Sequence, residues 1–392
     1  MTGVTTPSLQ APEVGVRVNR WKRPRRVVST LAIAALALTL AACGGDDAEG
    51  DDSGGGDGGD AGKVGVILPD AVSSPRWEAN DRPSLEAAFK DAGIESTIEN
   101  AGGDVAKFGT ICDSMINEGV NVLMIVNLDS DSGAACLQKA TDAGITSIDY
   151  DRLTLGGGAS YYVSFDNVEV GRLMGEGLTK CLDDAGKTQA NIAYINGAPT
   201  DNNAALFKQG YEEALAPKID SGDYKLVGDQ TGEWDADKAA DAFDGIYTAN
   251  DGNVDGVVSA NDTMAGGIIA RLKANGLAGK VPVTGQDASV EGLQRILDGS
   301  QCMTVYKNTN VEADLASQLA IALIEGDQDK ADSLATGTVE DTEAGTDVKS
   351  ALATPEAIYI DGVAKVIADG FQPKEDVCSG EFAQLCTDNG VQ

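Results

Sequence analysis

The sequence predicts an α/β protein with two doubly wound halves, each a parallel sheet covered by helices on both faces. Short, continuously apolar segments alternate with helical patterns of about 10–15 residues, and this alternation restarts once, near residue 161. Strands that are buried on both faces of a parallel sheet have this continuously apolar pattern. The length of 392 residues also allows two domains, each with a hydrophobic core of its own.

The first half begins with an apolar strand at residues 64–68, which Pro69 and Asp70 end. A helix follows at residues 77–92, with Leu85, Ala88 and Phe89 on one face. The remaining predicted elements are strands at 96–99, 122–126 and 146–149 and helices at 104–117 and 130–143.

The second half follows a segment at residues 161–164 and repeats the pattern. Its predicted strands are 192–195, 225–229, 256–259 and 281–284, and its predicted helices are 168–182, 202–215, 237–249, 263–275 and 290–297. Beyond it we predict a strand at 302–307, a helix at 311–325, an acidic and turn-rich segment at 327–349, and a strand at 357–360 followed by a short helix.

Composition excludes several functions. The chain has no histidine, so a Ser-His-Asp triad and a histidine-ligated zinc site are both impossible. The formal net charge of −33 argues against a nucleic-acid partner, because phosphates require a basic surface. The proportions of 42% hydrophobic and 23% charged residues are those of a soluble globular protein.

The N-terminal segment is typical of an export signal rather than of the folded body. Six basic residues precede an apolar run at 27–42, which is short for a membrane span. This run ends in Leu40-Ala41-Ala42-Cys43, which resembles a bacterial lipobox, so we expect residues 1–42 to be removed and Cys43 to carry lipid. The alternative is an uncleaved helix with a buried thiol. Residues 43–62 are rich in glycine and acidic residues and predict a flexible tether.

Six cysteines follow Cys43, at positions 112, 136, 181, 302, 378 and 386. An even number in an exported protein allows three disulfides with 15 possible connectivities. Cys378 and Cys386 are close enough to clip a loop, and Cys112 and Cys136 lie on successive predicted helices, which would leave Cys181 with Cys302. Free buried thiols are the alternative. No CxxC pair supports a redox motif or a zinc knuckle.

Polar residues follow nearly every predicted strand, at the edge where open parallel sheets bind ligands. Aspartate and asparagine dominate, joined in places by arginine or tryptophan. Such groups suit a polyhydroxylated ligand, because each hydroxyl both donates and accepts hydrogen bonds. Trp77 and Trp234 could stack against its C–H faces. The alternative is that the polar residues cap helices and form turns, and that the tryptophans belong to the core.

Other motifs are weaker. Gly186-Lys187-Thr188 resembles the end of a phosphate-binding loop, but the position of the required earlier glycine holds Cys181. The segment at 129–133 lacks the downstream glutamate of a calcium loop. We therefore predict no metal and no cofactor. A pair of carboxylates for glycoside hydrolysis remains open, because many acids are present and no local signature singles out two of them.

Seven segments together resemble the periplasmic sugar-binding proteins of ABC transporters, of the LacI-type superfamily, and in particular the D-xylose-binding branch. The similarity extends from Lys63 to about Phe371. The segments are 64–70 with Ser74-Pro75-Arg76-Trp77, Ile148-Asp149-Tyr150-Asp151-Arg152-Leu153, Tyr161-Tyr162-Val163-Ser164-Phe165-Asp166-Asn167, Asp201-Asn202-Asn203-Ala204, Ser259-Ala260-Asn261-Asp262, Gly285-Gln286-Asp287-Ala288 and Met303-Thr304-Val305-Tyr306-Lys307.

The resemblance implies a type I periplasmic binding protein fold: two lobes joined by three crossing strands, near residues 162–165, 303–307 and 353–359. It places residues 63–164 plus 304–352 in the N-terminal lobe and residues 165–303 plus 353–392 in the C-terminal lobe. One monosaccharide would bind between them. The implied ligand-binding residues are Arg76, Trp77, Asp151 and Arg152 from the first lobe, Asp166 and Asn167 at the first crossing, Asn202, Asn203, Trp234, Asn261 and Asp287 from the second lobe, and Lys307 at the second crossing.

These features together predict a lipid-anchored, monomeric solute-binding protein on the outer face of the cell membrane. It would capture a monosaccharide, with D-xylose as the first choice, and deliver it to an ABC permease and its ATPase. It would not be an enzyme. Two alternatives remain at this point: a lipid-anchored glycosidase, and a sensory protein that signals sugar binding to a membrane receptor.

Overall fold

The computed structural model describes residues 62–391. The predicted export signal at 1–42, the lipidated Cys43 and nearly all of the predicted tether at 43–62 lie outside the described residues. Between residues 62 and 391, no helix combines the length and the apolar character needed to cross a membrane.

The first lobe is built on a seven-stranded sheet with the strand order β10-β11-β5-β4-β3-β1-β2. All neighbouring strands run parallel except β10, which is antiparallel to β11. The strands are β1 (Lys63–Leu68), β2 (Glu95–Asn100), β3 (Val122–Ile125), β4 (Thr146–Tyr150), β5 (Tyr161–Phe165), β10 (Gly337–Asp341) and β11 (Thr346–Ala353).

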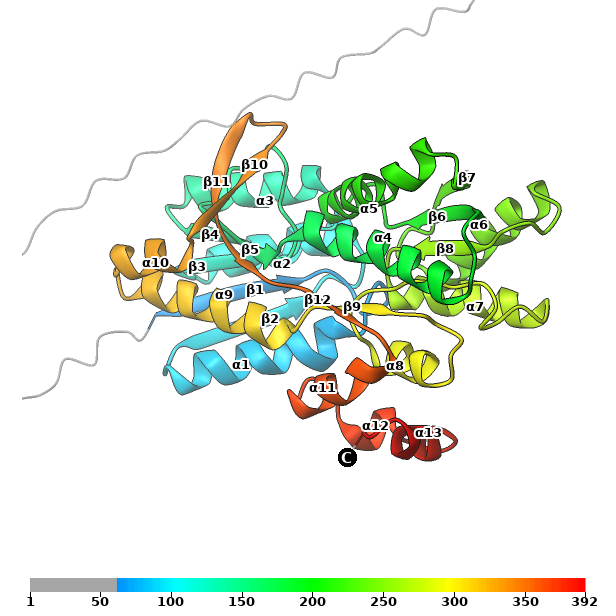
Figure 1. Cartoon of the computed structure of the whole chain (residues 1–392). Coiled ribbons are helices and arrows are strands. Elements are labelled where there is room, and N and C mark those ends of the chain that lie inside the picture. Colours follow the sequence, from blue (N-terminus) through cyan, green and yellow to red (C-terminus); the bar gives the residue numbers. More distant parts are fainter. Residues whose placement is uncertain (1–61, 392) are drawn as a thin grey trace, which may run out of the picture. The chain divides into compact units, whose positions relative to one another are not determined.

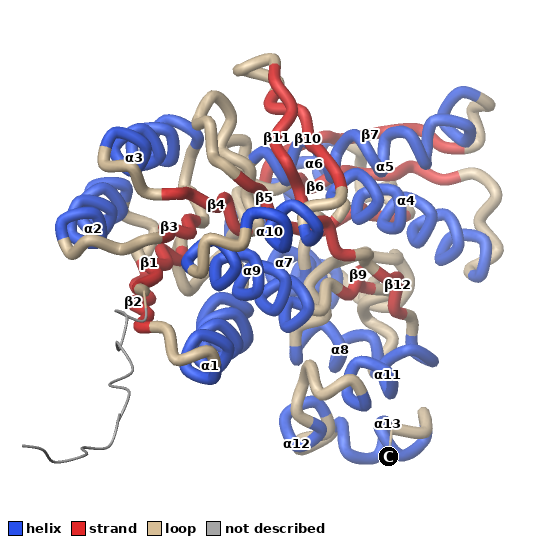
Figure 2. Tube along the Cα trace, turned by 90° about the vertical axis from the view of Figure 1, so that its left-hand side faces the viewer, coloured by secondary structure: helices blue, strands red, loops and turns tan. Residues whose placement is uncertain are grey.

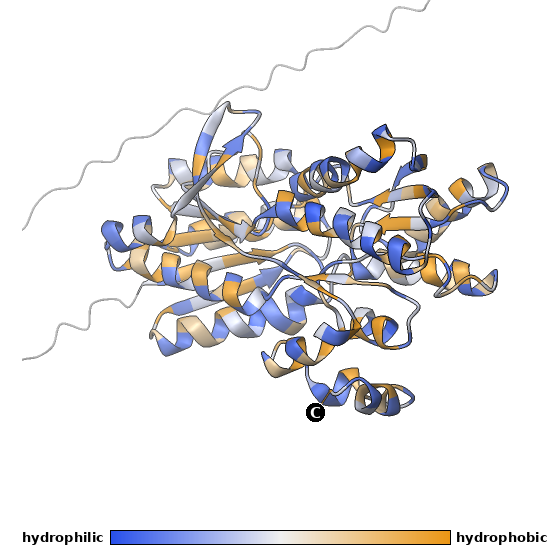
Figure 3. Cartoon of the chain, viewed as in Figure 1, coloured by the Kyte–Doolittle hydropathy of each residue, from blue (hydrophilic) through white to orange (hydrophobic). Residues whose placement is uncertain are grey.

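Helices cover both faces of this sheet (Figure 2). On one face lie α1 (Arg82–Asp91), α9 (Thr309–Ile324) and α10 (Gln328–Leu334), and on the other lie α2 (Val105–Asn117) and α3 (Ser130–Asp142). Strand residues alternate between the two cores: Val66 and Met124 belong to the first, and Ile67 and Leu123 belong to the second. Strands β1 and β3 are apolar along nearly their whole length and are buried on both faces. Figure 3 shows the orange, apolar segments in the interior of this lobe.

The second lobe has a three-stranded parallel sheet in the order β7-β6-β8. Its strands are β6 (Ala190–Asn196), β7 (Tyr224–Thr231) and β8 (Gly256–Ser259), and its helices are α4 (Asn167–Asp184), α5 (Asn202–Asp220), α6 (Ala236–Ala249), α7 (Asp262–Ala274) and α8 (Val290–Leu297). Helices α4 and α5 approach very closely, since a Cβ on Gly171 would lie 2.0 Å from the carbonyl oxygen of Phe207.

The chain passes between the lobes three times (Figure 1). Strand β5 leads from the first sheet into α4, β9 (Thr304–Tyr306) leads back to α9, and β11 continues into β12 (Glu356–Ile358). Strands β9 and β12 pair antiparallel to each other. This arrangement confirms the predicted fold class of two α/β lobes joined by three strands.

The C-terminal segment forms a small core of its own against α8. It contains η2 (Ile360–Gly362), α11 (Val363–Ala368), α12 (Lys374–Val377) and α13 (Phe382–Asp388). Val363, Phe371, Val377 and Cys386 pack with Leu293 of α8. The segment is therefore anchored to the second lobe.

One local prediction was wrong, and two were incomplete. Residues 281–284 do not form a strand: only Val283 makes a single bridge, to Val257, because Pro282 has no N–H to donate to a sheet. The helix predicted at 77–92 is two elements, the π-helical η1 (Trp77–Asp81) and then α1, which has a proline in its first turn. The segment at 327–349 is ordered as α10, β10 and part of β11. Glu340 and Asp347 are exposed on its strands and Val348 is buried, whereas Asp341 is buried and accepts the N–H of Gly156.

The described residues contain three disulfides. Cys112–Cys136 joins α2 to α3, Cys181–Cys302 joins α4 to the segment just before β9, and Cys378–Cys386 closes a loop in the C-terminal segment. The second of these ties a crossing strand to the second lobe.

Candidate ligand-binding site

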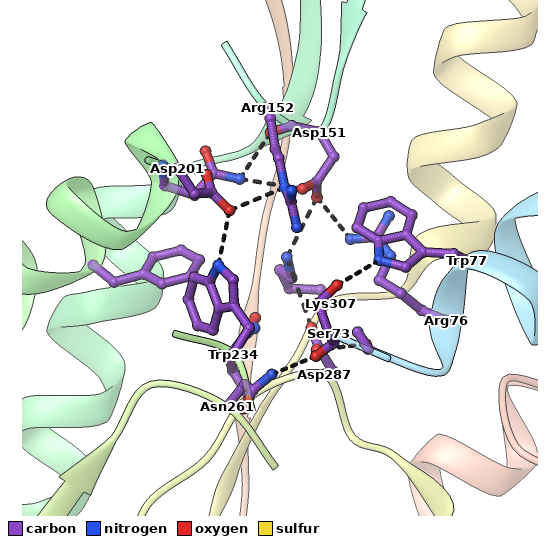
Figure 4. A pocket seen from close by; sticks show the side chains of 14 residues that line it. Ser73, Arg76, Trp77, Asp151, Arg152, Asp201, Trp234, Asn261, Asp287 and Lys307 are labelled. Carbon is purple, nitrogen blue, oxygen red and sulfur yellow. Dashed lines mark hydrogen bonds and ion pairs between the residues drawn. The ribbon is translucent and has the colours of Figure 1, made fainter. Parts of the chain in front are cut away.

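A pocket lies between the lobes, at the carboxyl ends of strands from both sheets (Figure 4). The space between its side chains amounts to about 310 Å³, a figure that includes the open mouth of the pocket. Its lining residues are Ser73, Ser74, Arg76, Trp77, Asp151 and Arg152 from the first lobe, Asp201, Asn203, Phe207, Trp234, Asn261, Gln286 and Asp287 from the second, and Lys307 after β9.

Several polar residues in the pocket also cap helices. Asp201 accepts a hydrogen bond from the N–H of Asn203 at the start of α5. Asn261 accepts one from the N–H of Met264 at the start of α7, while its amide nitrogen donates to the carbonyl of Ser73 in the first lobe. The capping and pocket-lining interpretations of these strand-end residues are therefore both correct, and capping holds each side chain in one orientation.

Three lining residues have a backbone conformation that non-glycine residues seldom adopt. The φ angles are +63° for Asp151, +60° for Trp234 and +96° for Asp287. Such conformations cost free energy and concentrate at functional sites. Asp151 lies in the connection from β4 to β5, Trp234 in that from β7 to α6, and Asp287 shortly before α8, and all three side chains line the pocket.

Arg76 organises a buried cluster of charges. Its side chain is only 3% exposed, and its guanidinium lies 2.7 Å from Asp151 Oδ2, 2.6 Å from Asp81 Oδ1 and 2.5 Å from Glu312 Oε2. Burial alone would lower the pKa of Arg76, but these three carboxylates raise it well above its usual value. Burial raises the pKa of Glu312 to about 8. The guanidinium is therefore held in place from behind the pocket.

Lys307 stands between carboxylates of the two lobes. Its Nζ lies 3.5 Å from Asp151 Oδ2 and 3.7 Å from Asp287 Oδ1. Burial by itself would raise the pKa of Asp151, but Lys307, Arg76 and Arg152 together lower it far below its usual value. Asp151 is therefore a permanent hydrogen-bond acceptor in the pocket.

Further bonds connect the two lobes directly. Arg152 Nε forms an ion pair with Asp201 Oδ2 at 2.9 Å, and Ser74 Oγ donates to Asp287 Oδ2 at 2.9 Å. Asn203 donates to the carbonyl of Asp151 at 2.9 Å. All of these residues line the pocket, so closing the lobes assembles the site.

Two tryptophans supply flat apolar surface. Trp77 donates its indole N–H to Ser73 Oγ, and the Arg76 guanidinium lies 4.4 Å from the centre of its ring. Trp234 donates to Asp201 Oδ2 at 3.2 Å. A Cβ on Gly197 would lie 2.0 Å from the ring of Trp234, so only glycine leaves room for this indole. Rings combined with paired polar groups suit a hydroxylated ligand with C–H faces.

The structure brings nine of the predicted ligand residues to this pocket: Arg76, Trp77, Asp151, Arg152, Asn203, Trp234, Asn261, Asp287 and Lys307. The other three lie elsewhere. Asp166 is an exposed cap of α4. Asn167 lies behind the site and donates to Asn203 Oδ1 at 2.8 Å. Asn202 lines a separate hollow with Asp129 and Asp131, because the next residue along α5 points to the other side.

Five lining residues were not predicted: Ser73, Ser74, Asp201, Phe207 and Gln286. Ser74, Asp201 and Gln286 lie within the quoted strand-end segments, although the list of implied ligand-binding residues leaves them out. Phe207 lies in the second turn of α5 and carries no signal of its own, because a buried aromatic residue on a helix is usually part of a core.

Two α/β lobes that close over a pocket at three crossing strands define a bilobal solute-binding protein. The sequence matches the periplasmic binding protein domain over residues 64–328. The chain belongs to the periplasmic binding protein family.

Individual relatives agree with this assignment. The chain is 35% identical over 324 residues to the D-xylose-binding periplasmic protein of Haemophilus influenzae, which covers 80% of this chain and 92% of that protein. It is 33% identical over 336 residues to the multiple sugar-binding periplasmic receptor ChvE of Rhizobium radiobacter, over 81% and 92% of the two chains. A solute-binding protein of an ABC transporter from Clostridium phytofermentans, solved with bound β-D-glucose, superimposes with a TM-score of 0.72 at 28% identity, over 80% of this chain and 99% of that one.

The first two of these relatives are named as sugar-binding proteins, and the third as the solute-binding protein of an ABC transporter. The chain is accordingly a binding protein and not an enzyme, and the glycosidase alternative is set aside.

Proposed function

We propose that the chain is the sugar-binding component of an ABC importer and that its pocket takes one monosaccharide, with D-xylose as the first candidate. The observation that carries this proposal is the combination of Trp77 and Trp234 with a ring of charged and amide groups in the pocket between the lobes.

The contacts of the pocket suggest a role for each group. Asp151, Asp287 and Asn261 would accept or share hydrogen bonds with sugar hydroxyls, and Arg76, Arg152, Asn203 and Lys307 would donate to them. The indole rings of Trp77 and Trp234 would pack against C–H groups. Each hydroxyl would thus meet at least one charged partner, and such hydrogen bonds are the stronger ones.

The choice of D-xylose comes from the relatives. The proteins named for D-xylose from Haemophilus influenzae and Escherichia coli are 35% and 34% identical to this chain. The ChvE receptor, named for multiple sugars, is nearly as similar at 33%. D-Glucose, D-galactose, L-arabinose and D-ribose are therefore the necessary comparisons.

Sugar binding would act by closing the two lobes. We propose the lobe limits 63–164 plus 304–352 and 165–303 plus 353–392, with hinge motion at the three crossing segments. Hinge closure around a ligand is established behaviour for periplasmic binding proteins. A ligand shifts such an equilibrium only through a higher affinity for the closed state, which requires contacts from both lobes. The closed monomer would then deliver its sugar to the permease and its ATPase.

Calorimetric titration of residues 63–392 with the five sugars tests the proposal. We expect tight one-to-one binding of one or two of them. Failure of all five to release or absorb heat would contradict monosaccharide binding and would turn the search to polyols and oligosaccharides.

A growth experiment separates import from sensing. If the role is import, deleting the gene should abolish growth on the bound sugar at low concentration. Normal growth together with a lost transcriptional response would instead support the sensory role.

The lipid anchor is a separate part of the proposal. It rests on the tetrapeptide Leu40-Ala41-Ala42-Cys43 after the apolar run. The Cys43→Ala variant should leave the membrane fraction and keep the sugar affinity of the wild type. A variant that still sediments with membranes would contradict the lipobox interpretation.

A further inference from the structure

We infer that Gln286 is a specificity-determining residue of this site and that its side-chain amide recognises one particular hydroxyl of the sugar. This inference deepens the proposed function and rests on it. Gln286 lines the pocket and is only 4% exposed. Within residues 62–391, no protein group donates a hydrogen bond to its buried Oε1 atom.

A buried amide oxygen without a donor is costly. Leaving such a group unsatisfied costs about 1–3 kcal/mol, and most buried polar atoms in folded proteins have a partner. Other buried polar atoms of the described residues also lack a hydrogen bond, but of these only Arg152, Asp287 and Gln286 belong to residues that line the pocket. Arg152 and Asp287 each face an opposite charge, at 2.9 Å and 3.7 Å. Among these three lining residues, Gln286 is the one whose unsatisfied atom, Oε1, faces no opposite charge within the described part of the chain.

The backbone holds Gln286 in a fixed position. Its carbonyl accepts a hydrogen bond from the N–H of Asp262 at 3.0 Å, and it forms a parallel bridge with Val305 of β9. The next residue, Asp287, donates its N–H to the carbonyl of Val305 at 2.9 Å. The side chain therefore starts from a rigid point between Asn261, the cap of α7, and the carboxylate of Asp287.

This position determines the chemistry of the recognised group. A sugar hydroxyl can donate to Oε1 and accept from the amide nitrogen, whereas a C–H group at the same place can do neither. A site built to hydrogen-bond a hydroxyl rejects the analogue that lacks it, because the polar groups of the protein then remain unpaired. The ligand class is thus an aldose with a free hydroxyl at the position facing Gln286.

A comparison of two buried glutamines tests this inference. Gln301 is also buried, but its amide nitrogen donates to Asp262 Oδ1 at 2.6 Å and to the carbonyl of Met303 at 3.1 Å, and it does not line the pocket. Gln286→Leu and Gln301→Leu are therefore matched substitutions, one at an unsatisfied amide that faces the pocket and one at an amide satisfied within the protein.

The experiment measures the affinity of the purified wild type and both variants for D-xylose and its 2-, 3- and 4-deoxy derivatives, together with thermal unfolding. We expect Gln286→Leu to weaken D-xylose binding by about tenfold or more and to leave the melting temperature unchanged or higher. For the wild type, one of the deoxy sugars should bind about tenfold more weakly than D-xylose. For Gln286→Leu, the affinities for that deoxy sugar and for D-xylose should differ by no more than about threefold. Gln301→Leu should lower the melting temperature and keep the wild-type ranking of the four sugars.

The inference would be overturned if the wild type and Gln286→Leu distinguished D-xylose from its deoxy derivatives equally well. Unchanged D-xylose affinity in Gln286→Leu would also overturn it. These results would mean that the amide has a structural role or binds a water that the sugar does not touch. If the wild type binds none of the four sugars, the proposed function fails for this sugar class and the inference fails with it.

Discussion

Arg152 Nε lies 2.9 Å from Asp201 Oδ2, and this ion pair joins the end of β4 in the first lobe to the cap of α5 in the second. Both side chains are buried, and Asp201 Oδ2 also accepts the indole N–H of Trp234. Burial raises the pKa of Asp201, while the charge of Arg152 opposes that change. Asp201 therefore links lobe closure to the position of an aromatic ring in the pocket.

We predict that Asp201→Asn weakens sugar binding by about 30-fold, mainly through faster dissociation, because breaking a buried interfacial charge pair acts on the off-rate. Asparagine caps helices as well as aspartate does, so the fold should be retained. Trp77 and Trp234 are the two tryptophans beyond residue 42, and both line the pocket, so stopped-flow tryptophan fluorescence can follow release. The control is Asp184→Asn, which removes an exposed pair with Lys180. Equal dissociation rates in the wild type and Asp201→Asn would contradict this role.

Asp287 gives a second prediction. Its carboxylate accepts from Ser74 and faces Lys307, and its φ angle is +96°. Asp287→Asn keeps the size of the side chain and tolerates a positive φ, and we expect it to weaken sugar binding by about 30- to 1,000-fold. Asp287→Ala should lose binding as well, although its folded state carries added backbone strain. Calorimetry measures the loss, and a circular dichroism spectrum checks the fold. Wild-type affinity in folded Asp287→Asn would show that the carboxylate does not contact the ligand.

The pH dependence of stability provides a third prediction. Burial raises the pKa of Asp149 to about 7, whereas an unfolded aspartate has a pKa of about 3.9. Between these two pKa values Asp149 is protonated in the folded state and ionised in the unfolded state. Protonation therefore stabilises the folded state fully below about pH 4, and this stabilisation is lost as the pH rises to about 7. We expect Asp149→Asn to gain stability relative to the wild type between pH 5 and pH 8, by up to ~1.4 kcal/mol per pH unit below pH 7.

Urea unfolding at pH 5, 6, 7 and 8 measures this difference. Asparagine can still accept the hydrogen bond from the N–H of Thr154, so the local structure should remain. The exposed Asp91→Asn, which removes one surface carboxylate, serves as the control. If the free energy of unfolding of Asp149→Asn differed from that of the wild type by the same amount at all four pH values, the Asp149 carboxyl would be ionised from pH 5 to pH 8.

The disulfides give a fourth prediction. Cys181–Cys302 closes a loop with a sequence separation of 121, and Cys378–Cys386 closes one of 8. The chain-entropy treatment assigns the longer loop about 5 kcal/mol of stabilisation and the shorter one about 2.5 kcal/mol. Paired serine variants should show this order in urea unfolding. A larger loss from the Cys378–Cys386 pair would mean that the C-terminal segment depends on its clip for packing against α8.

Much of the fold could be predicted because its signals are local. The pattern of adjacent residues predicts a continuously apolar strand at 122–126 and an amphipathic helix at 104–117. The structure has β3 and α2 at these places. The pairing of β11 with β5 could not be derived in this way, because the two strands are far apart along the chain and the acidic residues of 327–349 hide the buried alternation.

The candidate site was predictable in outline for a similar reason. Ligand-facing residues follow strands, so Asp151, Asn261 and Asp287 could be proposed from position alone. Position alone does not distinguish Asn202 from Asn203, because which of two successive helical residues faces the cleft depends on how α5 packs against α4. Phe207 was missed since its place in the pocket depends on the same packing.

The sequence by itself determined the class of fold, the absence of histidine chemistry and the polar character of the strand ends, because these follow from composition and local pattern. Only the tertiary structure decided which polar groups meet. The buried bonds of Arg76 to Asp151 and Glu312, and the ion pair of Arg152 with Asp201, join residues 49 to 236 positions apart along the chain. The Arg76 contacts form when the first lobe folds, and the Arg152–Asp201 contact forms when the two lobes close, since a charge can be buried only where a distant partner compensates its lost hydration.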